Sequence, residues 1–282
     1  MHARSALFDL YGDHLRARGD WAPVAALVRL LAPLDIAAPA VRTAISRMVR
    51  QGWLEPVQLA SGRGYAPTDR ARHRLDDAAS RIYRTRDAAW EGGWDLLVLG
   101  IPDKRSARDR VRSALSFLGY APLSDSTWIS PVRSPEVDHL LATEQVGFAR
   151  LRAHDEKPAE TASRAWDLER LAQAYVDWRD FADRLLGDPD SQLAAIAHAQ
   201  QDERAFAVRS VLVHEWRKFL FTDPGLPAEL LPRGWVGHEA AAFFAREAAR
   251  LLPAASRFVD ECLAVHGRSP VKSSEQSGAH RA

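Results

Sequence analysis

Hydrophobic residues between positions 41 and 49 recur at the spacing of an amphipathic helix that buries one stripe. They are Val41, Ala44, Ile45, Met48 and Val49, at i, i+3, i+4, i+7 and i+8. The opposite face has no acidic residue and presents Arg42, Thr43, Ser46, Arg47 and Arg50. A helix over residues 38–52 could therefore enter a DNA major groove, where Arg reads guanine edges. An arginine-rich solvated surface is the alternative interpretation.

The neighbouring elements give this helix a context. Apolar faces and stop residues predict two helices before it, at residues 6–18 and 24–31. After it, strands at residues 54–60 and 65–67 flank Ser61-Gly62-Arg63-Gly64, a predicted tight turn with Arg63 at its tip. Three helices and a two-stranded ribbon predict a winged helix-turn-helix, whose wing, with Arg63 and Tyr65, reaches the adjoining DNA backbone or minor groove.

A second region mixes strands and helices. The apolar run at residues 94–101, WDLLVLGI, is typical of a buried strand. A helix at 106–117, a strand at 128–132, a helix at 135–143 and a strand at 146–151 follow. This order predicts a ferredoxin-like β-α sandwich.

From residue 162 onward the pattern predicts only helices, at 166–185, 203–221 and 238–251, the last continuing brokenly to 265. Three prolines make residues 222–235 a structured turn. The predicted fold class is therefore α+β and multidomain. Its parts are a winged helix with a linker helix (1–86), a ferredoxin-like middle domain (87–157), an α-helical effector and dimerisation domain (158–266) and a disordered tail (267–282).

Charge is distributed unevenly along the 282 residues. Residues 1–86 contain 14 Arg and 8 acidic residues, a net charge of +6, and the remainder contains 24 basic and 29 acidic residues, a net charge of −5. Only the first third is therefore expected to meet a polyanion. The predicted helix at 68–85 adds Arg70, Arg72 and Arg74, and either touches phosphates or links two domains.

The lack of membrane-spanning and signal-peptide patterns, together with the low cysteine content, favours a cytoplasmic protein. The chain has no run of about 18 apolar residues, and its N-terminus lacks the apolar core of a signal peptide. A single cysteine, Cys262, excludes an intrachain disulfide and a cysteine-based zinc site.

Three segments together resemble the PaaX family of transcriptional repressors. They are VRTAISRMVRQGWL, WDLLVLGIP and LVHEWRKFLFTDPGLPAELLPRGWVG, and the likeness spans about residues 4–265. The third is the most specific, because its His-x-x-Arg-Lys helix end precedes a long, irregular proline pattern. The resemblance implies a homodimeric repressor of an aromatic-acid catabolic operon of the phenylacetate type. It also implies release from operator DNA by an aryl-acyl-coenzyme A thioester such as phenylacetyl-coenzyme A.

An acyl-coenzyme A effector needs cations for its phosphates and an apolar slot for its acyl end. Two groups supply cations outside the winged helix. The first is His214, Arg217 and Lys218 beside Trp216 and Trp235. The second is Lys104, Arg105 and Arg108, with Arg110 and Arg112, at the start of a helix whose dipole favours anions. Helix capping with core packing, and a solvated helix face, are the respective alternatives.

Enzyme functions have weaker support, and no catalytic residue, metal site or cofactor is predicted. The middle domain resembles ferredoxin-like endonucleases of CRISPR systems, which would hold a metal at Asp103. One carboxylate beside Lys104 and Arg105 is a poor magnesium site. The other alternative is a small-molecule-binding or interaction protein whose winged helix contacts proteins instead of operator DNA; it would lack salt-sensitive DNA binding.

Overall fold

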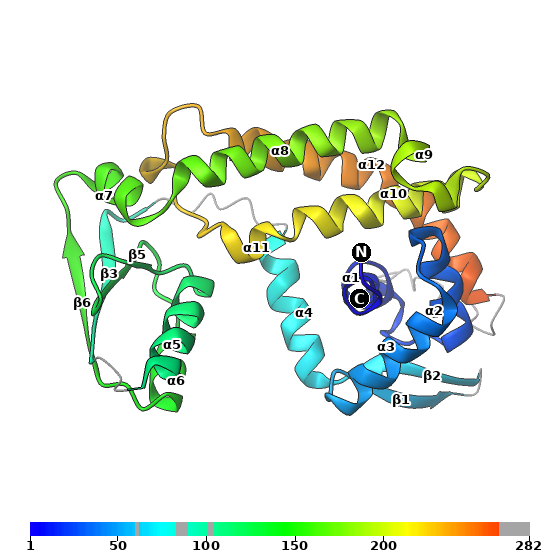
Figure 1. The fold of residues 1–282 in the computed structure, drawn as a ribbon, viewed down its shortest axis with the longest axis horizontal. Coiled ribbons are helices and arrows are strands. Elements are labelled where there is room, and N and C mark those ends of the chain that lie inside the picture. Colours follow the sequence, from blue (N-terminus) through cyan, green and yellow to red (C-terminus); the bar gives the residue numbers. More distant parts are fainter. Residues whose placement is uncertain (60–61, 83–89, 101–103, 265–282) are drawn as a thin grey trace, which may run out of the picture. The chain divides into compact units, whose positions relative to one another are not determined.

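The computed structural model describes residues 1–59, 62–82, 90–100 and 104–264 (Figure 1). Ser61, Asp103 and the predicted tail at 267–282 lie outside this range. The chain forms two compact units. The first comprises Met1–Ser80, Ala182–Glu215 and Ala245–Ala282, and the second comprises Arg81–Phe181 and Trp216–Phe244.

The N-terminal part of the first unit contains three helical segments and a hairpin. The first segment joins α1 (Ala3–Leu10) to a π-helical turn, η1 (Tyr11–Leu15), and a 3-10 turn, η2 (Arg16–Arg18). It starts three residues before the predicted Ala6, and Gly19 ends it with φ 79°. The next elements are α2 (Val24–Leu31), η3 (Ala32–Leu34), α3 (Ala38–Arg50), β1 (Leu54–Leu59), β2 (Gly62–Pro67) and α4 (Asp69–Ile82).

The core of this part forms where α1 and α2 pack on α3. Val41, Ala44, Ile45 and Met48 are buried, and Val49 is half-buried. Leu7, Leu27 and Leu30 from the other two helices are fully buried. Removing such side chains from water is the main force that holds these short helices together.

Two C-terminal helices complete the first unit. They are the part of α10 (Gln201–Trp216) up to Glu215 and the part of α12 (Val236–Ala264) from Ala245, with α9 (Pro189–Gln192) and η4 (Ala194–Ile196) before them. Phe206 and Phe258 bring them together at a ring distance of 5.3 Å. Helix α12 is unbroken across 29 residues although Pro253 lies inside it, so the predicted interruption before residue 265 was wrong. A long helix tolerates the one hydrogen bond that proline removes when its neighbours stay packed.

The second unit is built on a four-stranded antiparallel sheet in the order β4-β5-β3-β6. The elements in sequence are β3 (Gly93–Leu99), α5 (Arg105–Phe117), β4 (Ala121–Pro122), β5 (Thr127–Ser130), α6 (Glu136–Thr143) and β6 (Phe148–His154). The middle of β3 is apolar because both sheet faces are covered. Leu97 packs with α5 and α6, whereas Trp94 packs with Leu168 and Leu230.

Further helices of the second unit are α7 (Pro158–Ala165), the part of α8 (Leu168–Gly187) up to Phe181, α11 (Phe219–Thr222) and η5 (Ala228–Leu230). The predicted helix at 203–221 is divided between α10 and α11. Within the described ranges, no helix is long and apolar enough to cross a lipid bilayer.

Candidate functional site

Helix α3 presents its polar face to solvent. Arg42, Thr43, Ser46, Arg47 and Arg50 are all exposed, while the apolar stripe behind them is in the core. Among the described residues, no carboxylate forms an ion pair with any of these three arginines. The face therefore offers guanidinium and hydroxyl donors with no internal competitor for an anionic partner.

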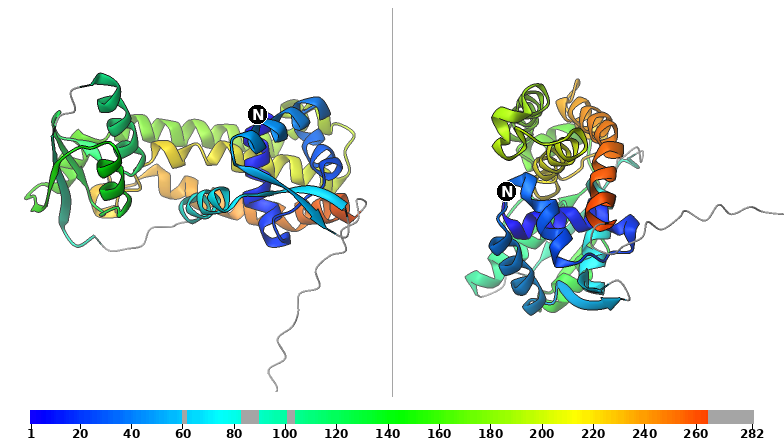
Figure 2. Two further views of the ribbon diagram at one scale, coloured as in Figure 1. Left: turned by 90° about the horizontal axis from the view of Figure 1, so that it is seen from below. Right: turned by 90° about the vertical axis from the view of Figure 1, so that its right-hand side faces the viewer.

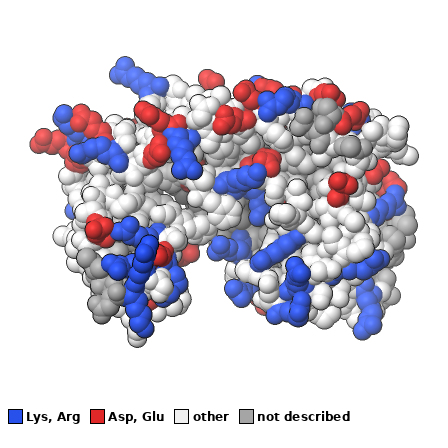
Figure 3. Space-filling model, in the orientation of Figure 1, with Lys and Arg blue, Asp and Glu red and all other residues white. Residues whose placement is uncertain are grey.

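A surface groove connects this face to the hairpin. It has a volume of about 410 Å³, and its lining includes Arg42, Ser46 and Arg50 of α3 and Tyr65 of β2. The structure thus brings these four residues together at one groove. Figure 3 shows Lys and Arg side chains gathered over the region of the first unit that carries α3 and the hairpin.

The hairpin is fixed to the helices through its second strand. Strands β1 and β2 run side by side (Figure 2), in register from Leu54 opposite Pro67 to Leu59 opposite Gly62. The backbone of Tyr65 exchanges two hydrogen bonds with Ala22, with N to O distances of 3.0 and 3.2 Å. The Tyr11 hydroxyl donates to the Tyr65 carbonyl at 2.8 Å. These bonds hold the inner part of the ribbon beside α2.

The position of Arg63 differs from the prediction. Arg63 is exposed, but it lies opposite Gln58 inside the ladder and not at the tip of the turn. Pairing continues to Gly62, whose φ of 126° a residue with a side chain rarely adopts. The connection is therefore residues 60–61, which lie outside the described ranges.

The aromatic residues of the predicted His214 group form a packed cluster in the second unit. Trp216 is buried and stacks on Phe244 with ring centroids 4.7 Å apart. Tyr175 stacks on Phe219 at 4.1 Å and meets Trp235 edge-on at 6.2 Å. Burial and the neighbouring Asp223 raise the pKa of Tyr175, whose hydroxyl donates to Asp223 at 2.6 Å. Trp216 therefore serves the core.

The polar members of the group are divided between the units. His214 belongs to the first unit, where its Nδ1 lies 2.7 Å from Oδ2 of Asp9. Arg217 and Lys218 belong to the second unit, and burial lowers the pKa of Arg217 while Lys218 is exposed. Trp235 is half-exposed and lines a surface hollow of about 350 Å³ with Arg233 and His238. The hollow brings an aromatic wall next to two basic side chains that the sequence prediction missed.

The second cation group lies at the start of α5. Lys104, Arg105 and Arg108 are exposed there, and Lys104 is the residue before the helix. Arg110 forms an ion pair with Glu144 at 2.6 Å, and Arg112 forms one with Asp125 at 2.7 Å. Arg108 and Arg112 line a hollow of about 100 Å³ whose apolar wall is Leu99 and Trp128.

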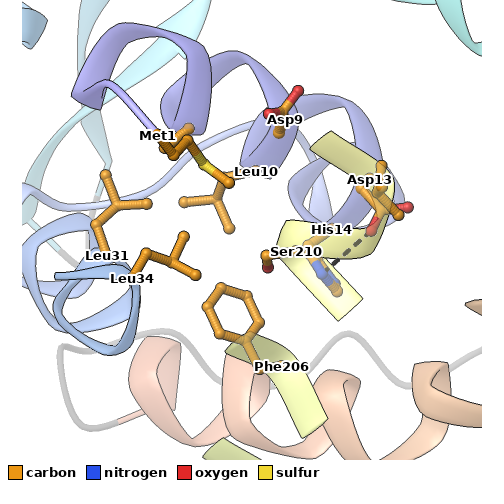
Figure 4. A pocket seen from close by; sticks show the side chains of 11 residues that line it. Met1, Asp9, Leu10, Asp13, His14, Leu31, Leu34, Phe206 and Ser210 are labelled. Atoms are coloured by element: carbon orange, nitrogen blue, oxygen red, sulfur yellow. Dashed lines mark ion pairs between the residues drawn. The ribbon is translucent and has the colours of Figure 1, made fainter. Parts of the chain in front are cut away.

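A buried polar cluster in the first unit was not predicted from the sequence (Figure 4). Asp13 on the π-helical turn lies 3.2 Å from Nε2 of His14 and 2.7 Å from Arg209 of α10. His14 is 1% exposed, and burial lowers its pKa to about 4 although Asp13 opposes this shift. A cavity of about 10 Å³, lined also by Asp9 and Ser210, adjoins the cluster and has room for about one water molecule.

The sequence does contain a signal for this cluster. Asp9 and Asp13 are one helical turn apart beside an apolar stripe, and Arg209 interrupts the apolar run FAVRSVLV. Acids and a base on buried helix faces must find each other, but the pattern does not say which partners they choose. Across the described part of the chain, no three His, Cys, Asp or Glu residues are grouped to hold a metal ion.

Comparison with known proteins gives consistent matches along the chain. The family models are PaaX-like protein at residues 2–71, PaaX protein central Cas2-like domain at 87–165 and PaaX-like protein C-terminal domain at 166–261. The transcriptional repressor PaaX of Escherichia coli (strain K12) is 29% identical over 269 residues, covering 91% of this chain and 83% of that protein. A solved structure, the uncharacterized protein Rv0674 from Mycobacterium tuberculosis, is 28% identical with a TM-score of 0.60, covering 91% of this chain and 98% of that one. The resemblance seen in the sequence is thus confirmed, and the chain belongs to the PaaX-like protein family.

Proposed function

We propose that this protein is a transcriptional repressor that binds operator DNA through α3 and the β1–β2 ribbon, as a winged helix-turn-helix. The observation that carries the proposal is the acid-free face of α3, which shares a groove with Tyr65. In such a module the reading helix enters the major groove and the ribbon meets the flanking backbone. The name of the Escherichia coli relative supports repression over activation.

The proposed contacts are Arg42, Thr43, Ser46, Arg47 and Arg50 from α3 and Arg63 and Tyr65 from β2. Arginine donors pair with guanine edges or with phosphates, and short hydroxyl residues fit against bases or backbone. Arg63 is an exposed residue of β2, so it is proposed as a contact of the DNA backbone or minor groove.

The middle of the chain is proposed as a ferredoxin-like domain. The order of elements from β3 to β6 and the sheet order β4-β5-β3-β6 support it. The ranges of the family models support a division of the chain into N-terminal, middle and helical parts, which we place at 1–86, 87–157 and 158–266, with a tail at 267–282.

The proposed effector is an aryl-acyl-coenzyme A thioester such as phenylacetyl-coenzyme A, and the regulated operon serves aromatic-acid catabolism of the phenylacetate type. One candidate site comprises Trp235, Arg217 and Lys218, with the hollow that Arg233 and His238 line. The buried Trp216 supports this site only indirectly, through Tyr175, whose ring contacts both tryptophans. His214, the other predicted member, belongs to the first unit, where it contacts Asp9. The other candidate comprises Lys104, Arg105 and Arg108, beside the hollow that Arg108 shares with Trp128. Both combine cations with an aromatic wall, as the ligand requires.

The proposed mechanism is a shift between two states of a cytoplasmic homodimer. A dimer reads two half-sites one helical turn of DNA, about 34 Å, or a multiple of it apart. In a second state of the dimer the two DNA-binding helices would have another spacing. An effector that binds this state more tightly lowers the affinity for the operator, at most by the ratio of its affinities for the two states. This mechanism needs no catalytic residue, metal or cofactor.

Gel-shift titration of the full chain tests both parts. The expected result is operator binding that weakens steeply with salt and is released by an aryl-acyl-coenzyme A thioester but not by free coenzyme A. Binding without release would refute the induction mechanism alone. Absence of salt-sensitive DNA binding would refute the repressor and favour a small-molecule-binding or interaction protein; metal-dependent cleavage of the duplex would instead indicate a nuclease.

A further inference from the structure

Two arginines of the first unit lie over aromatic rings that contact each other. Cζ of Arg4 in α1 is 5.8 Å from the ring centroid of Phe8, and Cζ of Arg70 in α4 is 4.5 Å from that of Trp53. The two rings meet edge to face, with centroids 5.4 Å apart and planes at 81°. Both arginines are exposed and both rings are half-buried. We call these four residues the arginine–aromatic ladder.

Four other arginines of residues 1–80 form ion pairs with acids. Arg16 pairs with Asp76 at 2.5 Å, and Arg18, Arg29 and Arg72 also have carboxylate partners. Within the described residues, Arg4 and Arg70 have no ion pair to a carboxylate. They share this property with the proposed DNA contacts Arg42, Arg47, Arg50 and Arg63. Exposed cations without carboxylate partners, clustered on one part of a domain, are typical of a surface for a polyanion.

The arginine–aromatic ladder adjoins the end of the proposed reading helix. Trp53 follows α3 closely, and its backbone N–H donates to the Met48 carbonyl at 2.9 Å. The start of α4 is fixed to the same place, because the Thr68 hydroxyl donates to the Gly52 carbonyl at 2.8 Å. Trp53 lies three positions after Arg50, which limits their Cα separation to about 10 Å. A DNA strand carries one phosphate for about every 3.4 Å of helix axis, so side chains about 10 Å apart can contact neighbouring phosphates.

We propose that Arg4 and Arg70 are phosphate contacts of the bound duplex, positioned by Phe8 and Trp53; this rests on the proposed function. A guanidinium over a ring keeps its N–H edge available for an anion. The stacking also restricts the side chain before binding, so less conformational entropy is lost on contact. Such contacts strengthen binding to any sequence and specify none.

The experiment measures dissociation constants of the full chain for operator and random duplexes over a salt series. The variants are Arg4→Gln, Arg70→Gln and both together, with Arg16→Gln as the matched control because Arg16 is already paired with Asp76. Each lost contact should reduce the slope of log K against log salt by about 0.9, and the double variant by about 1.8. Affinity should fall by the same factor on both duplexes. Arg70→Lys should keep the slope because it keeps the charge.

A folded fraction that is equal at all salt concentrations scales every dissociation constant by one factor and leaves the slope unchanged, so circular dichroism over the same salt series checks that a variant can be compared with wild type. A double variant with the slope of wild type and of Arg16→Gln would overturn the proposal while leaving the repressor function intact. A loss confined to the operator would also overturn it, because it would indicate base reading. If the wild-type chain has no salt-sensitive binding, the repressor function itself fails.

Discussion

Nδ1 of His214 on α10 lies 2.7 Å from Oδ2 of Asp9 on α1, and the Asp9 side chain is only 8% exposed. This pair joins α10 to the first helix of the chain, 205 residues away. Together with the contact of Asp13 with Arg209, it connects the helices around α3 to α10 through polar groups. This contact gives His214 a role inside the first unit that does not depend on any ligand.

His214→Ala is expected to lower the free energy of unfolding by about 1–3 kcal/mol, because a largely buried carboxylate loses a partner. Urea unfolding followed by circular dichroism measures this. His198→Ala serves as the control, since His198 is exposed and its removal should cost less than about 0.5 kcal/mol. A His214 variant with unchanged stability that needs more thioester for operator release would instead assign His214 to the effector site.

Stability should fall in mild acid because of His14. Burial holds its pKa at about 4, below the 6.5 of the unfolded chain, so the unfolded state binds more protons between these values. The contribution of neutral His14 to the free energy of unfolding is fully present above pH 6.5. It is lost as the pH falls towards 4, by about 3 kcal/mol in total. Urea unfolding at several pH values should show this slope in wild type.

His14→Gln should flatten that pH dependence, whereas His198→Gln, at an exposed position, should keep it. If the His14 variant and wild type lose stability in parallel on acidification, another group causes the transition.

Arg47→Ala should weaken operator binding by about 1–3 kcal/mol if the side chain pairs with a guanine. The loss should be much smaller on random duplex, because only the cognate base supplies both acceptors. Fluorescence anisotropy with both duplexes at one salt concentration gives the ratio of the dissociation constants for random and operator DNA. Equal losses on the two duplexes would make Arg47 a phosphate contact.

Gly64→Ala should displace the ribbon. A Cβ built at Gly64 would lie 2.5 Å from the carbonyl oxygen of Ala22 and 2.6 Å from the Trp21 ring, so backbone would have to move. A cost of about 1–3 kcal/mol in unfolding and weaker DNA binding are expected. Gly187→Ala is the control, since a Cβ there meets nothing within 4 Å. Unchanged thermal unfolding and affinity in the Gly64 variant would show that the ribbon adapts freely.

Several elements could be predicted from the hydrophobic pattern of their own segment. The helix at α3 follows from apolar spacing alone, and all four of its buried residues were among those predicted. Strand β3 was recognisable because apolar residues on both sides of a strand require two covered faces. In these elements each residue's burial is decided by its own segment.

Long-range partners could not be predicted in the same way. The contacts of Asp9 and Asp13 are made to α10, about 200 residues later. Nearness in sequence also misled the prediction of the effector group. His214 and Trp216 lie two positions apart at the end of α10, yet His214 meets Asp9 while Trp216 enters an aromatic core.

The discontinuous make-up of the first unit limits how evolution or a protein engineer can recombine this regulator. Residues 1–80 cut out alone would leave Asp13 without Arg209, and Arg18 and Arg29 without the acids Asp260 and Glu261. A chimera that exchanges residues 1–80, which carry the proposed DNA contacts, should therefore also carry Ala182–Glu215 and the end of α12. New operator specificities are then expected to arise by substitution on the surface of α3, and not by exchange of whole N-terminal segments between relatives.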